Sequence, residues 1–112
     1  MARGGFPGIP GGGNMQQLMR QAQKMQQQMV EKQEELDERT YEASAGGGMV
    51  TAKVSGKREL LELTINPQVV DAEDVELLQD MVLAAVNEAL RTGEETREAE
   101  MSKFGGGMGG MF

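Results

Sequence analysis

The sequence predicts an α+β fold in which a long helix, three antiparallel strands and a second long helix follow one another. Two observations predict this order. Apolar residues recur at steps of three and four over residues 15–36 and again over residues 75–90, as they do along one face of a helix. Between these stretches, residues 50–65 alternate between apolar and polar side chains, which is typical of strands in a half-buried sheet.

The composition limits the kinds of site that this chain can build. Its 112 residues suffice for one small domain, expected over residues 14–104 between flexible glycine-rich tails at residues 1–13 and 105–112. The chain has no Cys and no His, so the commonest metal ligands and the commonest acid–base catalyst are missing. No apolar run approaches the roughly 20 residues that span a bilayer. We therefore expect a cytoplasmic protein that is not an enzyme and uses no metal, cofactor or small-molecule substrate.

The first helix is expected to begin at Asn14, a capping residue with Gln17 three positions later, and to end near Arg39. Its apolar positions follow a heptad pattern, the pattern by which one helix packs along another. We name four of them the seam: Leu18, Ala22, Met25 and Met29. The seam is predicted to pack against another helix of the same chain or of a second copy, and a methionine-rich groove for a partner protein is the alternative.

The strands are expected at residues 40–45, 50–54 and 60–65. One apolar face of the second and third strands comprises Val50, Ala52 and Val54, and Leu61, Leu63 and Ile65. Gly56 is expected in the turn between these two strands, and Pro67 cannot continue the ladder after the third. A separate run, Gly46–Gly48, leads into a strand and not into a helix. It therefore predicts a tight turn and not a phosphate-binding loop.

The last helix is expected to begin near Asp71, with acidic residues in its first turn. Both helices are longer than strands of six residues, which span only about 20 Å. Their free ends, near Met15 and Lys103, are therefore expected to lie together as an antiparallel pair projecting from the sheet. Such a small core leaves apolar seams and sheet edges uncovered, which favours a homodimer.

The chain resembles the YbaB/EbfC family of bacterial nucleoid-associated proteins. The resemblance rests on a Gln- and Met-rich first helix, on "GGGMVTAKVSG" and "INPQVV", and on a final helix containing "AAVNEALR". It covers about residues 14–104 and implies a tweezer-shaped homodimer of helix-strand-strand-strand-helix protomers. It also implies binding of double-stranded DNA by the projecting helices, with effects on DNA conformation, nucleoid organisation and gene expression.

Four basic residues near the expected tip are the candidate DNA contacts: Arg20, Lys24, Arg97 and Lys103. The first two share one exposed helix face in the acid-free first 30 residues, where they could bind phosphates. The chain lacks an aromatic cluster for base stacking and a base-reading cluster, so we expect weak sequence preference.

Two alternatives stay open. A second basic group, Lys53, Lys57 and Arg58, forms another DNA surface or protects the sheet edge. The whole chain, with its net charge of −7 and methionine-rich seam, is alternatively a dimeric protein-interaction module without DNA binding.

Overall fold

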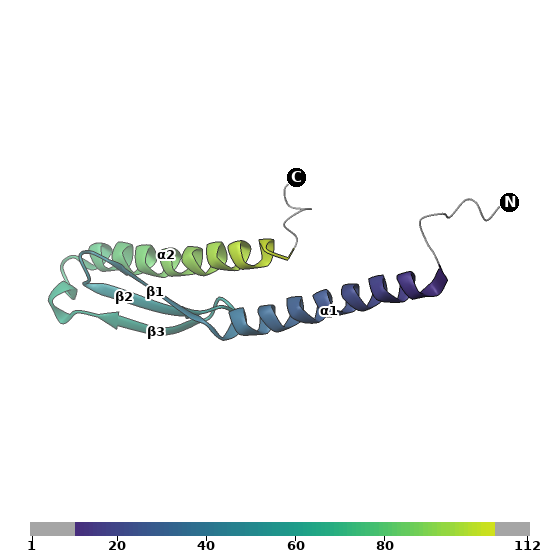
Figure 1. Ribbon diagram of the computed structural model, residues 1–112. Coiled ribbons are helices and arrows are strands. Elements are labelled where there is room, and N and C mark those ends of the chain that lie inside the picture. The colour runs from purple at the N-terminus through teal and green to yellow at the C-terminus, as the bar shows by residue number, and fades with distance from the viewer. Residues whose placement is uncertain (1–10, 105–112) are drawn as a thin grey trace.

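The computed structural model describes residues 11–104, which form two long helices and one three-stranded sheet (Figure 1). In chain order the elements are α1 (Gly11–Glu38), β1 (Thr40–Ala45), β2 (Val50–Ser55), β3 (Leu60–Ile65), the short 3-10 helix η2 (Pro67–Val69) and α2 (Val75–Ser102). The sheet is antiparallel with strand order β1-β2-β3, so the α+β prediction is confirmed. Neither helix in this described part of the chain is long and apolar enough to cross a membrane.

Both helices begin at other residues than expected. Helix α1 begins at Gly11, so Asn14 lies inside it and is not its cap. An existing helix extends one residue at a time without a new nucleation cost, and this offsets the low helix propensity of glycine. Helix α2 begins at Val75, four residues later than expected, because Asp74 is its N-cap and accepts a hydrogen bond from the Leu77 amide at 3.3 Å. Apart from residues 11–13, the expected tails lie outside the described residues.

The core lies between α2 and the face of β1 and β2 that α2 covers. Its fully buried members are Val50, Ala52 and Val54 of β2 together with Ala85 and Ala89 of α2. These two alanines and Gly93 recur every fourth residue, so they form a ridge of small residues along α2. A Cβ at Gly93 would lie 3.0 Å from the Tyr41 ring, so the ridge lets α2 pack close to β1.

Strand β3 lies outside the cover of α2. Leu60, Leu61 and Leu63 remain 48%, 54% and 37% exposed. A bulge between Lys53 and Val54 shifts the register, so that Leu60 pairs with Val54 and Leu63 with Ala52. The apolar face expected to include Leu61 therefore carries Leu60 in its place, next to Leu63 and Ile65.

Glycines occupy the turns for two different reasons. Gly46, Gly47 and Gly48 have φ of 65°, 68° and 94°, which confirms the turn predicted between β1 and β2. In the β2–β3 turn, the residue with positive φ is Arg58 (68°) and not Gly56. Gly56 is needed because a Cβ there would overlap the carbonyl group of Leu36 at the end of α1.

Helix α1 extends far beyond the sheet, whereas α2 lies along it (Figure 1). The two helices contact each other only near the sheet, where Lys32 pairs with Glu100 at 3.3 Å and Asp37 pairs with Arg97. The end of α2 therefore lies beside the last two turns of α1 and not beside Met15, which is roughly 26 Å from Lys32 along the helix. The expectation that the two free ends meet is wrong, because packing on the sheet takes up most of α2. We name residues 15–30 of α1 the arm.

Candidate nucleic-acid interface

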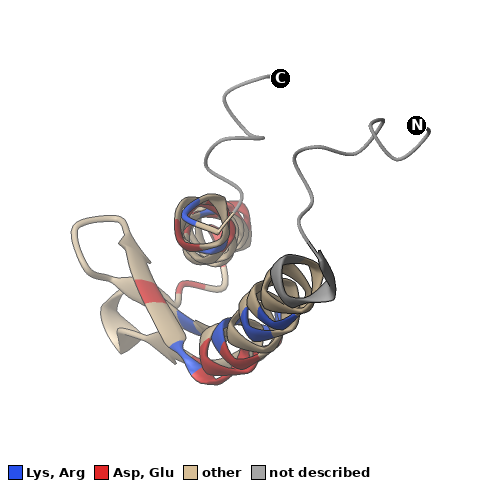
Figure 2. Ribbon diagram, turned by 45° about the vertical axis from the view of Figure 1, so that its right-hand side comes forward, with Lys and Arg blue, Asp and Glu red and all other residues tan. Residues whose placement is uncertain are grey.

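The arm carries two basic side chains that no carboxylate of residues 11–104 neutralises. Arg20 and Lys24 are one helical turn apart, both are exposed, and neither forms an ion pair within residues 11–104. The sequence has no acidic residue before Glu31, and seven glutamines lie between residues 15 and 30. Figure 2 shows the basic residues on the outer part of α1 and the acidic residues closer to the sheet. Exposed cations among neutral hydrogen-bond donors can approach a phosphate backbone without repulsion.

Arg97 has a different environment from the arm cations. Its side chain is 29% exposed and bonds both the Asp37 carboxylate of α1 and the Gly56 carbonyl oxygen, the latter at 3.2 Å. Gly56 in turn donates its amide hydrogen to the carbonyl of Arg39 at 2.9 Å. Arg97 thus joins α2, the end of α1 and the β2–β3 turn. These contacts indicate a role in holding the base of the arm.

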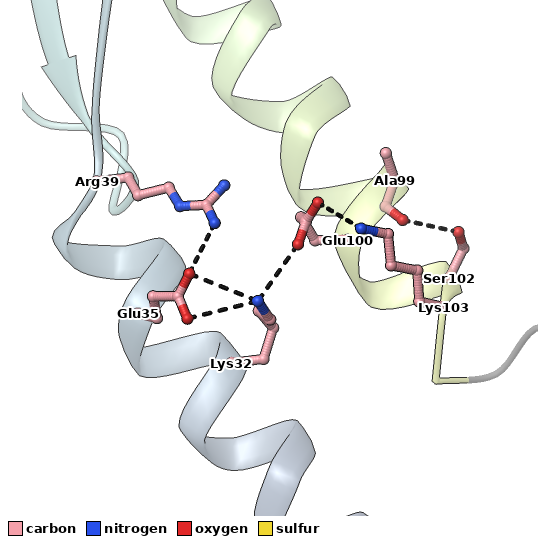
Figure 3. A network of polar contacts seen from close by, with 7 residues as sticks. All are labelled: Lys32, Glu35, Arg39, Ala99, Glu100, Ser102 and Lys103. Atoms are coloured by element: carbon pink, nitrogen blue, oxygen red, sulfur yellow. Dashed lines mark hydrogen bonds and ion pairs between the residues drawn. The ribbon is translucent and has the colours of Figure 1, made fainter.

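Lys103 belongs to an ionic cluster of five residues at the base of the arm: Lys32, Glu35, Arg39, Glu100 and Lys103 (Figure 3). Glu100 of α2 lies between Lys103 at 3.0 Å and Lys32 at 3.3 Å. Glu35 accepts hydrogen bonds from Arg39 at 2.7 Å and from Lys32 at 3.4 Å. The cluster therefore links α1 to α2 with alternating charges, and it leaves little net positive charge for DNA.

The two carboxylates of this cluster have perturbed acidity. The hydrogen bond from Arg39, followed by the charge of Lys32, lowers the pKa of Glu35 below its usual value of 4.5. The hydrogen bonds from Lys103 and Lys32 lower the pKa of Glu100 in the same direction. Both shifts follow from cations that favour the charged form, so both carboxylates are ionised at neutral pH.

The second basic group is divided by acidic neighbours. In the sheet register Lys53 lies between Glu42 of β1 and Glu62 of β3. Arg58 forms an ion pair with Glu94 at 3.0 Å. This distribution favours a structural role for Lys53 and Arg58 over a continuous DNA surface.

The acidic residues at the base of the arm are a feature that the sequence analysis did not use. Five acids occur within residues 31–38, and Glu31, Glu34 and Glu38 among them are exposed. The other two form ion pairs, Glu35 with Arg39 and Asp37 with Arg97. The charge pattern alone contained this signal: α1 is basic in its outer part and acidic next to the sheet.

An apolar surface also escaped the sequence analysis. Leu83 of α2 is 60% exposed, and with Leu78, Gln79 and Val82 it lines a shallow depression. Glu94 lies three turns beyond Leu83 on the same flank of α2. It pairs with Arg58 in the β2–β3 turn, so this flank of α2 is the one nearest to β3. We name Leu60, Leu63, Leu78, Val82 and Leu83 the β3–α2 surface. The open sheet edge and these apolar side chains resemble half of a protein interface.

The chain is similar to known proteins both in its sequence and in its fold. The model of the YbaB/EbfC DNA-binding family matches residues 11–108. A nucleoid-associated protein of Clostridium novyi is 59% identical over 100% of both chains. Another, from Acetivibrio thermocellus, is 59% identical over 99% of this chain and 96% of its own. Among solved structures, an uncharacterized protein from Helicobacter pylori matches with a TM-score of 0.61 and 27% identity, over 75% of this chain and 88% of that chain.

Proposed function

This chain belongs to the YbaB/EbfC DNA-binding family, and on that premise we propose that it is a nucleoid-associated protein that binds double-stranded DNA with its α1 arm. Through such binding it alters DNA conformation, nucleoid organisation and gene expression. The alternative of a protein-interaction module without DNA binding is not favoured by this family membership.

The observation that carries the proposal is the position of Arg20 and Lys24. Both are exposed and free of ion pairs within residues 11–104, and both lie on the part of α1 that projects beyond the rest of the fold. A duplex carries one negative charge per roughly 1.7 Å, so two cations one turn apart can both reach phosphates of one strand. Arg97 and Lys103 mainly hold α2 against the end of α1, and this contact sets the direction in which the arm projects.

We expect this binding to depend little on DNA sequence. Phosphate contacts position a protein on DNA but do not read its sequence. The one tyrosine, Tyr41, packs against Gly93 in the fold and is not available to stack on bases. Glutamines of the arm supply further hydrogen bonds to phosphates and sugars.

The active form is proposed to be a homodimer that buries the β3–α2 surface. Leu60, Leu63 and Leu83 are 48%, 37% and 60% exposed, and β3 has an unpaired edge. A two-fold contact through this surface covers both features at once. The dimer then presents two arms, with two phosphate-binding cations on each.

A salt titration tests the proposal. Fluorescence anisotropy of a labelled duplex is measured with the purified protein at several salt concentrations. Four phosphate contacts per dimer predict a slope of about −3.6 in log affinity against log salt, or roughly a 150-fold loss between about 50 and 200 mM. Absence of binding at the lowest salt, or an affinity that salt does not change, would contradict DNA binding through phosphates.

A further inference from the structure

Three of the four seam residues are exposed in this structure, and Met29, nearest the base of the arm, is partly buried. Leu18 and Met25 are 56% and 49% exposed, and Ala22 is exposed as well. Leu36, seven residues beyond Met29 and on the same face of α1, is by contrast fully buried at the base of the arm. The face that α1 packs against the rest of the fold therefore continues along the arm without a cover from residues 11–104. A second copy of the arm has the chemistry and the spacing to cover it.

The spacing of the seam is complementary to itself in an antiparallel arrangement. With residues 15–32 of two α1 helices overlapping, Ala22 of one lies opposite Met25 of the other, and Leu18 lies opposite Met29. Each layer thus pairs a smaller side chain with methionine, whose flexible chain adapts to the remaining space. The overlap of 18 residues is roughly 27 Å long.

The charges of α1 favour this antiparallel direction. The positions that flank the seam, Met19, Gln21, Gln26 and Gln28, are uncharged, so no like charges meet at its borders. The antiparallel arrangement keeps the two acidic bases at opposite ends of the overlap, roughly 27 Å apart. A parallel arrangement would place the two acidic bases, each with five acids in residues 31–38, side by side.

We propose that the arms of two dimers pair antiparallel through their seams, and that the resulting assembly bridges two DNA duplexes. Arg20 and Lys24 lie on the side of α1 opposite the seam, so pairing leaves them exposed on the two outer sides of the arm pair. Each side then holds one duplex. The bridging part of this inference rests on the proposed function, whereas the pairing of arms does not require DNA.

Disulfide crosslinking tests the arrangement of the arms. The chain has no cysteine, so single Ala22→Cys and Met25→Cys proteins each carry one thiol. The two proteins, one with a mass tag, are mixed and oxidised without DNA. We expect disulfides mainly between the two different variants, because Ala22 lies opposite Met25. Crosslinks that form only within each variant, or none at all, would overturn the antiparallel pairing.

A bridging assay separates arm pairing from DNA binding. One duplex is immobilised, a second one is labelled, and the retained label is measured. Met25→Gln changes the seam, and Val30→Gln is a matched control off the seam with the same new side chain and nearly equal exposure, 49% against 48%. We expect Met25→Gln to lower bridging at least about tenfold, while its affinity for one duplex stays within about twofold of the unmodified protein. Val30→Gln should bridge normally.

The outcomes distinguish this inference from the function on which it rests. If the unmodified protein binds a single duplex but does not bridge, or if Met25→Gln bridges as well as Val30→Gln, bridging through paired arms is wrong and DNA binding stands. If the unmodified protein binds no duplex, the proposed function is wrong, and the crosslinking result alone decides whether the arms pair.

Discussion

The contact between Gly56 and the end of α1 sets the position of the arm. Replacing Gly56 by a larger residue should therefore destabilise the fold strongly. In a Gly56→Ala protein the new methyl group would overlap the Leu36 carbonyl oxygen and lie 2.8 Å from the carbonyl carbon and 3.0 Å from Asp37 Cα. All three atoms belong to the backbone, so no side-chain rotation relieves the overlap. The end of α1 and the β2–β3 turn must move apart.

The loss of stability can be estimated from the groups that separate. An extra methyl group in a well-packed site typically lowers the free energy of unfolding by about 1–3 kcal/mol. Because the atoms that block the methyl group here belong to the backbone, we expect a loss of about 3 kcal/mol or more. Separation also weakens two hydrogen bonds of Gly56, to Arg39 at 2.9 Å and from Arg97 at 3.2 Å. For a domain of this size, 3 kcal/mol lowers the midpoint of thermal unfolding by roughly 12–24 °C.

Gly47→Ala is the control for this substitution. A Cβ at Gly47 has open space around it, but the φ of 68° strains any other residue by about 1–2 kcal/mol. Urea unfolding followed by circular dichroism, at one protein concentration, should therefore rank Gly56→Ala as the less stable variant. Equal stability of the two variants, or a Gly56→Ala protein as stable as the unmodified one, would refute the role of Gly56 as a close contact.

Three further predictions concern the base of the arm and the β3–α2 surface. Because the pKa values of Glu35 and Glu100 are lowered in the folded state, their contribution to stability is present above about pH 4.5 and is lost as the pH falls below it. Between pH 6 and about pH 3, thermal melts should show that a Glu35→Gln/Glu100→Gln protein loses less stability than the unmodified protein. Arg97→Gln should lower the free energy of unfolding by about 1 kcal/mol in a urea titration, since it loses bonds to α1 and to the β2–β3 turn. In a Met25→Gln background, which removes arm pairing, Leu83→Glu should yield monomers in analytical ultracentrifugation, whereas Ala84→Glu, an exposed neighbour outside the depression, should stay dimeric; a dimeric Met25→Gln/Leu83→Glu protein would contradict the proposed interface.

The fold was predictable where local patterns dominate. Alternation placed β2, with Val50, Ala52 and Val54 buried, and steps of three and four placed both helices. The position of Leu60 was not predictable from alternation, because a bulge changes which residues share a face. Nor was the reason for Gly56, which depends on the approach of Leu36 from an element 20 residues earlier.

The candidate site was predictable only in part, because contacts between elements distant in the sequence do not follow from local patterns. The exposed face of Arg20 and Lys24 follows from helix geometry within one element. The surroundings of Arg97 depend on how far α2 extends past the sheet, which is a property of tertiary packing. Once α2 lies along β1 and β2, Arg97 reaches Asp37 and the turn, and Lys103 reaches Glu100. Residues that look equivalent in the sequence thereby acquire different roles.

The most direct test of the proposed DNA interface compares two pairs of substitutions that remove the same charge. Duplex affinity is measured against salt for Arg20→Gln/Lys24→Gln and for Arg97→Gln/Lys103→Gln, with circular dichroism to show that both proteins are folded. If the arm holds the DNA, the first pair removes most of the affinity and nearly all of the salt slope of about −3.6, and the second pair leaves the slope almost unchanged. A slope that falls with the second pair and stays with the first would contradict the assignment of the interface to the arm.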